Sequence, residues 1–168
     1  MNQPATVDYG MRTHLALPYE EAVEKVTAVL KAEGFGVLTQ IDVKATLKQK
    51  LDIDFRRYII LGACNPPLAY RAFSTELEIG LLLPCNVIVY EDESGAGSIV
   101  SIIDPIMMLG IGINPGLSAV GEEASTRLRR VLDTLEAQQL SPPLAPAREY
   151  LSVENSQRGR RVLFHPNL

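Results

Sequence analysis

Two cysteines are the residues of this 168-residue chain whose type and placement best suit chemistry. Cys64 follows a short apolar run that predicts a strand, and Cys85 precedes a second such run. If these strands pair antiparallel, both thiols lie at the same end of a sheet; if they run parallel, the thiols lie at opposite ends and a shared site fails. Two neighbouring thiols suit a soft metal such as Cu(I) or Zn, or reversible oxidation. Packing in the core is the competing interpretation, because free cysteine is among the most buried residue types.

The neighbours of the cysteines extend the candidate site. Asn65 and Pro66 predict the start of a helix, since Asn is a good N-cap and Pro a good first helical residue. The helix dipole is expected to lower the pKa of the preceding Cys64 thiol, and the free backbone N–H groups could bind an anion, although plain capping explains the pair equally. The ligand-binding or thiol site is therefore predicted at Cys64, Asn65, Pro66, Pro84 and Cys85, with Cys64 and Cys85 as candidate metal ligands.

Further metal ligands are scarce. A four-coordinate zinc site needs more than two thiols. His14 is the one histidine ahead of the C-terminal tail, so Cys64, Cys85 and His14 form a three-ligand set only if the first strand reaches the cysteines. An ordinary exposed histidine is the alternative. The carboxylates form no convincing acid–base pair, and a single histidine does not support a Ser-His-Asp arrangement, so the sequence leans away from an enzyme and leaves the question open.

Composition and charge bound the class of protein. Apolar residues make up 46% and charged residues 21%, which is typical of one globular domain, and the net charge of −4 argues against nucleic acid as the main partner. The first seven residues lack the basic and apolar regions of a signal peptide. The longest apolar stretch, 99–113, is interrupted by Asp104-Pro105 and is too short to span a bilayer. We therefore expect a cytoplasmic protein with reduced thiols and no membrane partner.

Hydrophobic periodicity predicts the elements that must position the cysteines. Gly34 is expected to end the first helix in a left-handed cap, and the residues Phe35, Val37, Thr39 and Ile41 are expected to share one face of the following strand. The predicted strands are 7–15, 35–41, 58–63, 86–91 and 98–103, and the predicted helices are 18–33, 45–51, 66–74 and 118–139. A clear hairpin and short turns favour an antiparallel sheet with helices on one face, a two-layer α+β sandwich.

The chain is divided into a domain over 1–140 and a Pro-rich linker with a polar C-terminal tail over 141–168. Arg158, Arg160 and Arg161 make the tail locally basic, and the apolar run 162–164 is expected to dock on the body or on a partner. A second apolar segment needs burial too, which a partner subunit would supply. It contains Ile106, Met107, Met108, Leu109, Ile111 and Ile113.

Three segments carry a resemblance to a known family. They are 33–38 (EGFGVL), 61–66 (LGACNP) and 79–87 (IGLLLPCNV). In this order and spacing they resemble domain-of-unknown-function family 302 (DUF302), over roughly Tyr9 to Leu135, with the tail outside. The resemblance implies a fold similar to the TATA-binding-protein-like class, a curved antiparallel sheet gripped by helices in the order β-α-β(4)-α. It also implies homodimers, and it implies no reaction because the family has no established activity.

Three functions remain open from the sequence. The first is a non-enzymatic module that binds a small ligand between the curved sheet and the long helix, with Cys64 and Cys85 at the rim. The second is a thiol redox or soft-metal protein that uses the same two cysteines. The third is a dimeric interaction module in which the cysteines are structural. The sequence identifies neither a cofactor nor the ligand.

Overall fold

The computed structural model describes residues 9–109 and 114–140. The elements in chain order are β1 (Gly10–Leu15), α1 (Tyr19–Ala32), β2 (Gly36–Asp42), α2 (Val43–Leu51), β3 (Tyr58–Cys64), α3 (Pro66–Thr75), the 3₁₀ helix η1 (Leu77–Leu82), β4 (Cys85–Glu91), β5 (Ser98–Ile103), α4 (Pro105–Leu109), the 3₁₀ helix η2 (Pro115–Leu117) and α5 (Ser118–Leu140). No helix in these two ranges is long and apolar enough to cross a membrane.

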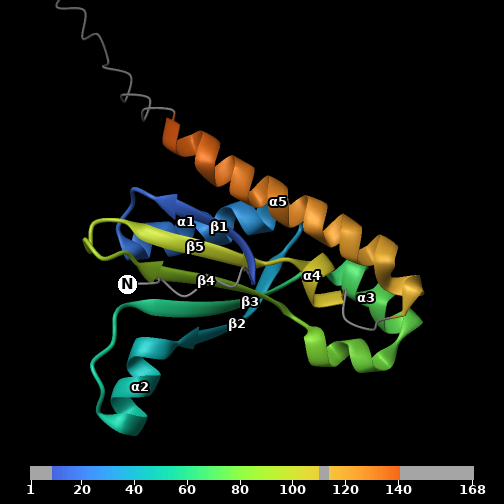
Figure 1. Ribbon diagram of the computed structural model, residues 1–168, viewed down its shortest axis with the longest axis horizontal. Helices are drawn as coiled ribbons and strands as arrows, with labels where there is room; N and C mark the ends of the chain where they lie inside the picture. Colours follow the sequence, from blue (N-terminus) through green and yellow to red (C-terminus); the bar gives the residue numbers. More distant parts are fainter. Residues whose placement is uncertain (1–8, 110–113, 141–168) are drawn as a thin grey trace, which may run out of the picture.

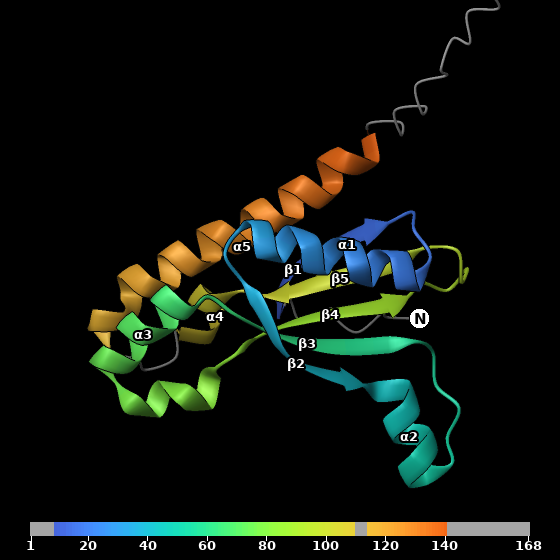
Figure 2. The same ribbon diagram turned by 180° about the vertical axis from the view of Figure 1, so that it is seen from behind.

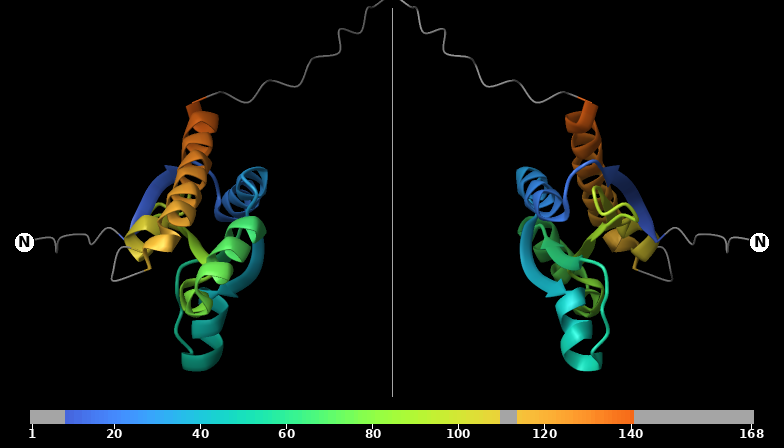
Figure 3. Two further views of the ribbon diagram at one scale, coloured as in Figure 1. Left: turned by 90° about the vertical axis from the view of Figure 1, so that its right-hand side faces the viewer. Right: turned by 90° about the vertical axis from the view of Figure 1, so that its left-hand side faces the viewer.

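The five strands form one antiparallel sheet in the order β1-β5-β4-β3-β2. Helices α1 and α5 cover one face of it, and no helix of the described residues lies on the other face (Figures 1 and 2). The order is therefore β-α-β(4)-α with α2 and α3 inserted, which confirms the predicted two-layer α+β sandwich. Helix α2 projects away from α1 and α5 (Figure 3), and the short helices α3, η1 and α4 gather at one end of the sheet.

The core lies between the sheet and the two long helices. Strand alternation aims one side chain in two at these helices, so the central strands present branched aliphatic residues to the amphipathic faces of α1 and α5. Fully buried core residues include Leu61, Val87, Val89, Val100 and Ile102 from the sheet and Val26, Leu30, Leu128, Val131 and Leu135 from the helices. Each of these helices packs as its spacing predicts.

Two local predictions are confirmed and one is wrong. Gly34 has a φ of 86°, in the left-handed region favoured by glycine, and Asn65 caps α3 by accepting the Leu68 N–H at 3.2 Å. A bulge between Val37 and Thr39 shifts the register of β2, so the four residues 35, 37, 39 and 41 do not share a face. No helix was predicted directly after Asp104, but this segment forms the short helix α4.

Candidate functional site

Both cysteines lie at the same end of the sheet. Strands β3 and β4 pair antiparallel, with Ala63 of β3 opposite Cys85 of β4. Cys64 is the last residue of β3 and lies opposite Gly36 of β2. The expectation that an antiparallel pair would bring the two thiols to one end is therefore correct, and both thiols are free.

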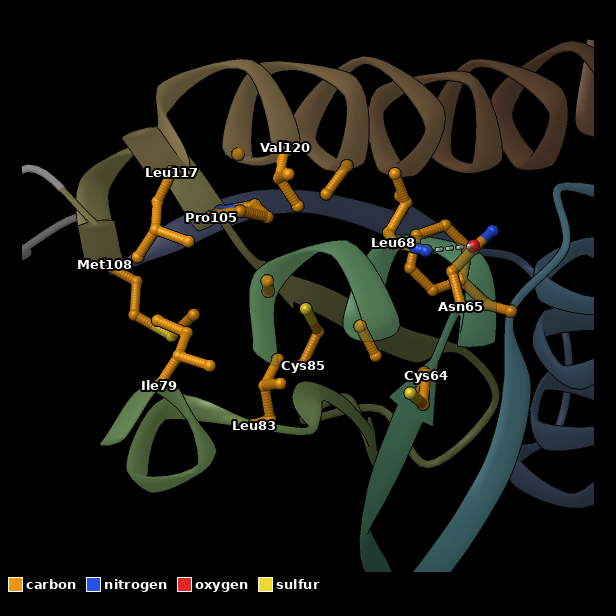
Figure 4. A pocket seen from close by; sticks show the side chains of 16 residues that line it. Cys64, Asn65, Leu68, Ile79, Leu83, Cys85, Pro105, Met108, Leu117 and Val120 are labelled. Carbon is orange, nitrogen blue, oxygen red and sulfur yellow. Dashed lines mark hydrogen bonds between the residues drawn. The ribbon is translucent and has the colours of Figure 1, made fainter. Parts of the chain in front are cut away.

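A pocket lies beside these two residues, between the end of the sheet and the short helices. Its volume is ≈ 50 Å³, enough for a few water-sized molecules, and its lining is almost wholly apolar. In Figure 4 the cysteine side chains lie on the side of the pocket away from α5. The other walls come from α3, η1, α4, η2 and α5, through residues that include Leu68, Ile79, Met108, Leu117, Val120 and Ala124.

The environment keeps both thiols protonated. Burial raises the pKa of the half-buried Cys64. Burial, and secondarily the nearby Cys64, raises the pKa of Cys85 to about 11. The prediction that the Cys64 pKa would be lowered is wrong, because burial removes water from around the sulfur and penalises the charged thiolate. At neutral pH the pocket therefore presents two uncharged thiols, a poor arrangement for thiolate chemistry.

The other predicted site residues have structural roles around the pocket. Asn65 lines it, but its side-chain oxygen is used in capping α3 (Figure 4). Pro66 is the first residue of α3 and Pro84 directly precedes β4, and neither is among the lining residues. Pro84 instead packs near Gly62, where an added Cβ would lie 2.7 Å from its ring. The structure thus brings together Cys64, Asn65 and Cys85, and leaves the two prolines beside them.

The three-ligand set with His14 is wrong. His14 lies opposite Ile99 in the β1–β5 pair, and its Nε2 is 2.8 Å from Oδ2 of Asp92 in the β4–β5 turn. That turn follows the C-terminal end of β4, whereas Cys85 begins the strand. Within the described residues, no group of three or more His, Cys, Asp or Glu side chains is placed to hold a metal ion. A two-thiol metal site stays a prediction.

Several lining residues escaped the sequence analysis. Met108 was assigned to a surface covered by a partner, but it lines the pocket from α4. Its neighbours Ile106 and Met107 are exposed, and their burial by a partner subunit stays a prediction. Residues 111 and 113 lie outside the described residues. Ile79 belongs to η1, which was not predicted. The apolar spacing in these segments signals burial, but it does not indicate that they bury against one another.

The fold and the pocket define a class of protein: an α+β domain with one helix-covered sheet face and a small apolar cavity at one sheet end. The family model described as "Domain of unknown function DUF302" matches residues 11–135, so the chain belongs to the DUF302 family. The chain is similar to the crystal structure of an uncharacterized conserved DUF302 protein from Bacillus stearothermophilus. That structure shares 30% identity, with a TM-score of 0.69 and coverage of 76% of this chain and 98% of that one. Among curated proteins, none matches the chain.

Proposed function

We propose that this protein is a non-enzymatic module that binds a small, uncharged, apolar molecule in the pocket at the end of the sheet. The observation that carries the proposal is the chemistry of the lining, which combines aliphatic side chains with two protonated thiols. Dry apolar cavities in proteins bind small apolar molecules, because such a guest restores dispersion contacts that the void lacks.

The lining disfavours a charged ligand. A buried ion without a partner loses its hydration at a cost of several kcal/mol, on the order of the penalties measured for unpaired buried charges. Among the described residues that line the pocket, none is a lysine, arginine, aspartate or glutamate. The cysteines therefore contribute shape and polarizability, in contact with the guest, and need not ionise.

A thermal-shift series with benzene and short alkanes tests this proposal. The filling variant is Ala69→Leu, since Ala69 lines the pocket and is only half-buried. The matched control is Ala45→Leu on the exposed side of α2. We expect at least one probe to raise the midpoint temperature of the natural protein and of Ala45→Leu, and not that of Ala69→Leu. Equal stabilisation of all three, or of none, contradicts the proposal.

The thiol redox or soft-metal function uses the same two residues and makes a different prediction. Native mass spectrometry of protein purified anaerobically without added metal, beside Cys64→Ser and Cys85→Ser, reports any bound mass. A metal or sulfur adduct lost in both variants would favour this second function. The raised pKa of both thiols weighs against it, because the thiolate is the metal ligand and the nucleophile.

A homodimer is favoured by the uncovered face of the sheet. Its central strands are apolar on this side too, through Tyr58, Ile60, Ile88, Tyr90 and Ile99, and the rings of Tyr58 and Tyr90 stack at 5.2 Å. Antiparallel sheets that face water usually alternate apolar with polar residues. Helix α2 also has no buried residue, although a nine-residue helix is marginal without packing. A second copy laid on this face would cover both.

Sedimentation measures this association. Ile88→Lys places a charge in the middle of the uncovered face, and Thr126→Lys places the same charge on the exposed side of α5 as a control. We expect Ile88→Lys to be monomeric at concentrations where the natural protein and Thr126→Lys are dimers. A natural protein that sediments as a monomer would contradict the homodimer.

A further inference from the structure

Helix α3 and the 3₁₀ helix η1 carry an exposed apolar stripe on the surface away from the pocket. Tyr70 is 76% exposed, Phe73 40%, Leu77 79% and Leu81 81%. Tyr70 and Phe73 are three residues apart on α3 and so share a helix face. The ring of Phe73 lies 3.3 Å from a Cβ built on Gly80, which brings the stripe onto η1. These four side chains, called the α3–η1 stripe below, need a partner more than scattered surface residues do.

The charge beside the stripe is acidic. Side chains three residues apart in a 3₁₀ helix eclipse one another, so Glu78 lies in line with Leu81. Glu76 lies at the N-terminal end of η1. Arg71, the basic neighbour on α3, is already paired with Glu123 at 2.6 Å. An occupant that fits the stripe therefore combines apolar side chains with adjacent positive charge.

A segment outside the described residues has that composition. Residues 158–164 read RGRRVLF, three arginines followed by three apolar residues, and they lie outside the described residues. The uncovered face of the sheet is a poorer match, because its central strands carry apolar and uncharged side chains without the acidic neighbours. We propose that residues 158–164 dock on the α3–η1 stripe of the same chain, with the arginines beside Glu76 and Glu78.

The length of the chain permits this contact. Helix α5 spans Ser118–Leu140, 23 residues, so its C-terminal end lies about 34 Å from its start at 1.5 Å per residue. The start of α5 and η2 lie beside α3 (Figure 1), at the end of the molecule that bears the stripe. Residues 141–157 can extend up to about 56 Å at roughly 3.3 Å per residue. The linker therefore reaches back along α5 with length to spare.

Because residues 158–164 belong to the same chain as the α3–η1 stripe, a weak contact is sufficient for docking. A short linker holds the segment at an effective concentration in the millimolar range, so docking does not require a high intrinsic affinity. The contact combines burial of apolar side chains with exposed charge pairs, and only the second part is screened by salt. Docking is expected to weaken, not vanish, at 1 M salt.

Hydrogen exchange of the 168-residue chain tests the proposal. The tail variant Leu163→Asp with Phe164→Asp removes the apolar contact, and Val153→Asp makes a similar change within the same tail as a control. We expect amides of 73–82 to exchange several-fold faster in the tail variant, with no change in Val153→Asp. Unchanged exchange in the tail variant overturns the proposal. Protection that depends on protein concentration also overturns it, because the occupant is then another molecule.

A charge exchange separates docking from loss of stability. Glu78→Arg and the pair Arg160→Glu with Arg161→Glu each place like charges together and should speed exchange over 73–82. Combining all three changes restores opposite charges, and exchange should return most of the way to the natural rate. Additive effects in the combined variant overturn the predicted pairing. Equal midpoint temperatures among the variants confirm that each chain is folded.

Discussion

The two ends of strand β4 place acidic groups in opposite environments. Cys85 begins the strand beside the apolar pocket, where burial raises its pKa. Asp92 follows the strand at the other end and accepts hydrogen bonds from the Ser94 N–H, the Ser94 hydroxyl and the Gly95 N–H, each at 2.7–2.9 Å. These donors, together with His14, hold the pKa of Asp92 well below its usual range.

The opposite pKa shifts of Cys85 and Asp92 illustrate two causes that change the pKa of any acidic group. Removing water without supplying donors penalises the charged form, whereas donors aimed at an exposed carboxylate favour it. One end of the sheet is therefore apolar and uncharged. The other end is a hydrogen-bonded turn around the Asp92 carboxylate, where His14 of β1 contacts the hairpin. Variants at matching positions in the two ends can sharpen or break this contrast.

The largest effect is expected from glycine substitutions at the two ends. Gly34→Ala adds a Cβ to a residue whose backbone is in the left-handed region, and this Cβ would lie 2.8 Å from Nδ2 of the buried Asn65. We therefore expect a loss of about 3 kcal/mol in the free energy of unfolding. Gly97→Ala meets the ends of the Asp92 and His14 side chains, which can move into solvent, so its loss should stay within about 1 kcal/mol. Urea unfolding measures the loss for each variant, and equal losses would contradict the difference between the two ends of the sheet.

The next effect is the pH dependence that Cys85 confers. The Cys85 thiol holds its proton more tightly in the folded protein than in the unfolded chain. Its contribution to the free energy of unfolding is therefore full below about pH 9 and is lost as the pH rises toward 11. A shift from 9.0 to about 11 corresponds to roughly 2–3 kcal/mol. Between pH 8 and pH 11, the free energy of unfolding should therefore fall more steeply for the natural protein than for Cys85→Ala. Parallel curves would show that Cys85 does not titrate with folding.

The smallest effect is expected at Asp92. Because the pKa of Asp92 is lowered in the folded protein, its contribution to the free energy of unfolding is present above the pKa of an unfolded aspartate, about 3.9. This contribution is lost as the pH falls below that value. Asp92→Asn should lower the midpoint temperature slightly at pH 7, and the difference should shrink below pH 4. Scanning calorimetry at both pH values checks this. A difference that grows at low pH would contradict the stabilisation of the Asp92 carboxylate by these hydrogen bonds.

Much of the architecture could be predicted because its signals are local. The alternating runs, the hairpin and the caps at Gly34 and Asn65 depend on residues a few positions apart, and the structure agrees with them. The antiparallel pairing of β3 and β4, which brings Cys64 and Cys85 to one end, was a condition that only the structure settled. The bulge in β2 and helix α4 were missed, because strand register and short helices depend on contacts with neighbouring elements.

The pocket could not be predicted in the same way, because its walls come from segments as far apart as Phe35 and Ala124. No motif or spacing links these wall residues in the sequence, and only packing shows which surfaces meet and where they leave a gap. The sequence by itself determined the order of the five strands and of the long helices, and it limited the two cysteines to the same end or to opposite ends of the sheet. The tertiary structure decided the cavity, the distance of His14 from it and the direction of the thiol pKa shifts, because desolvation depends on every atom that replaces water around a group.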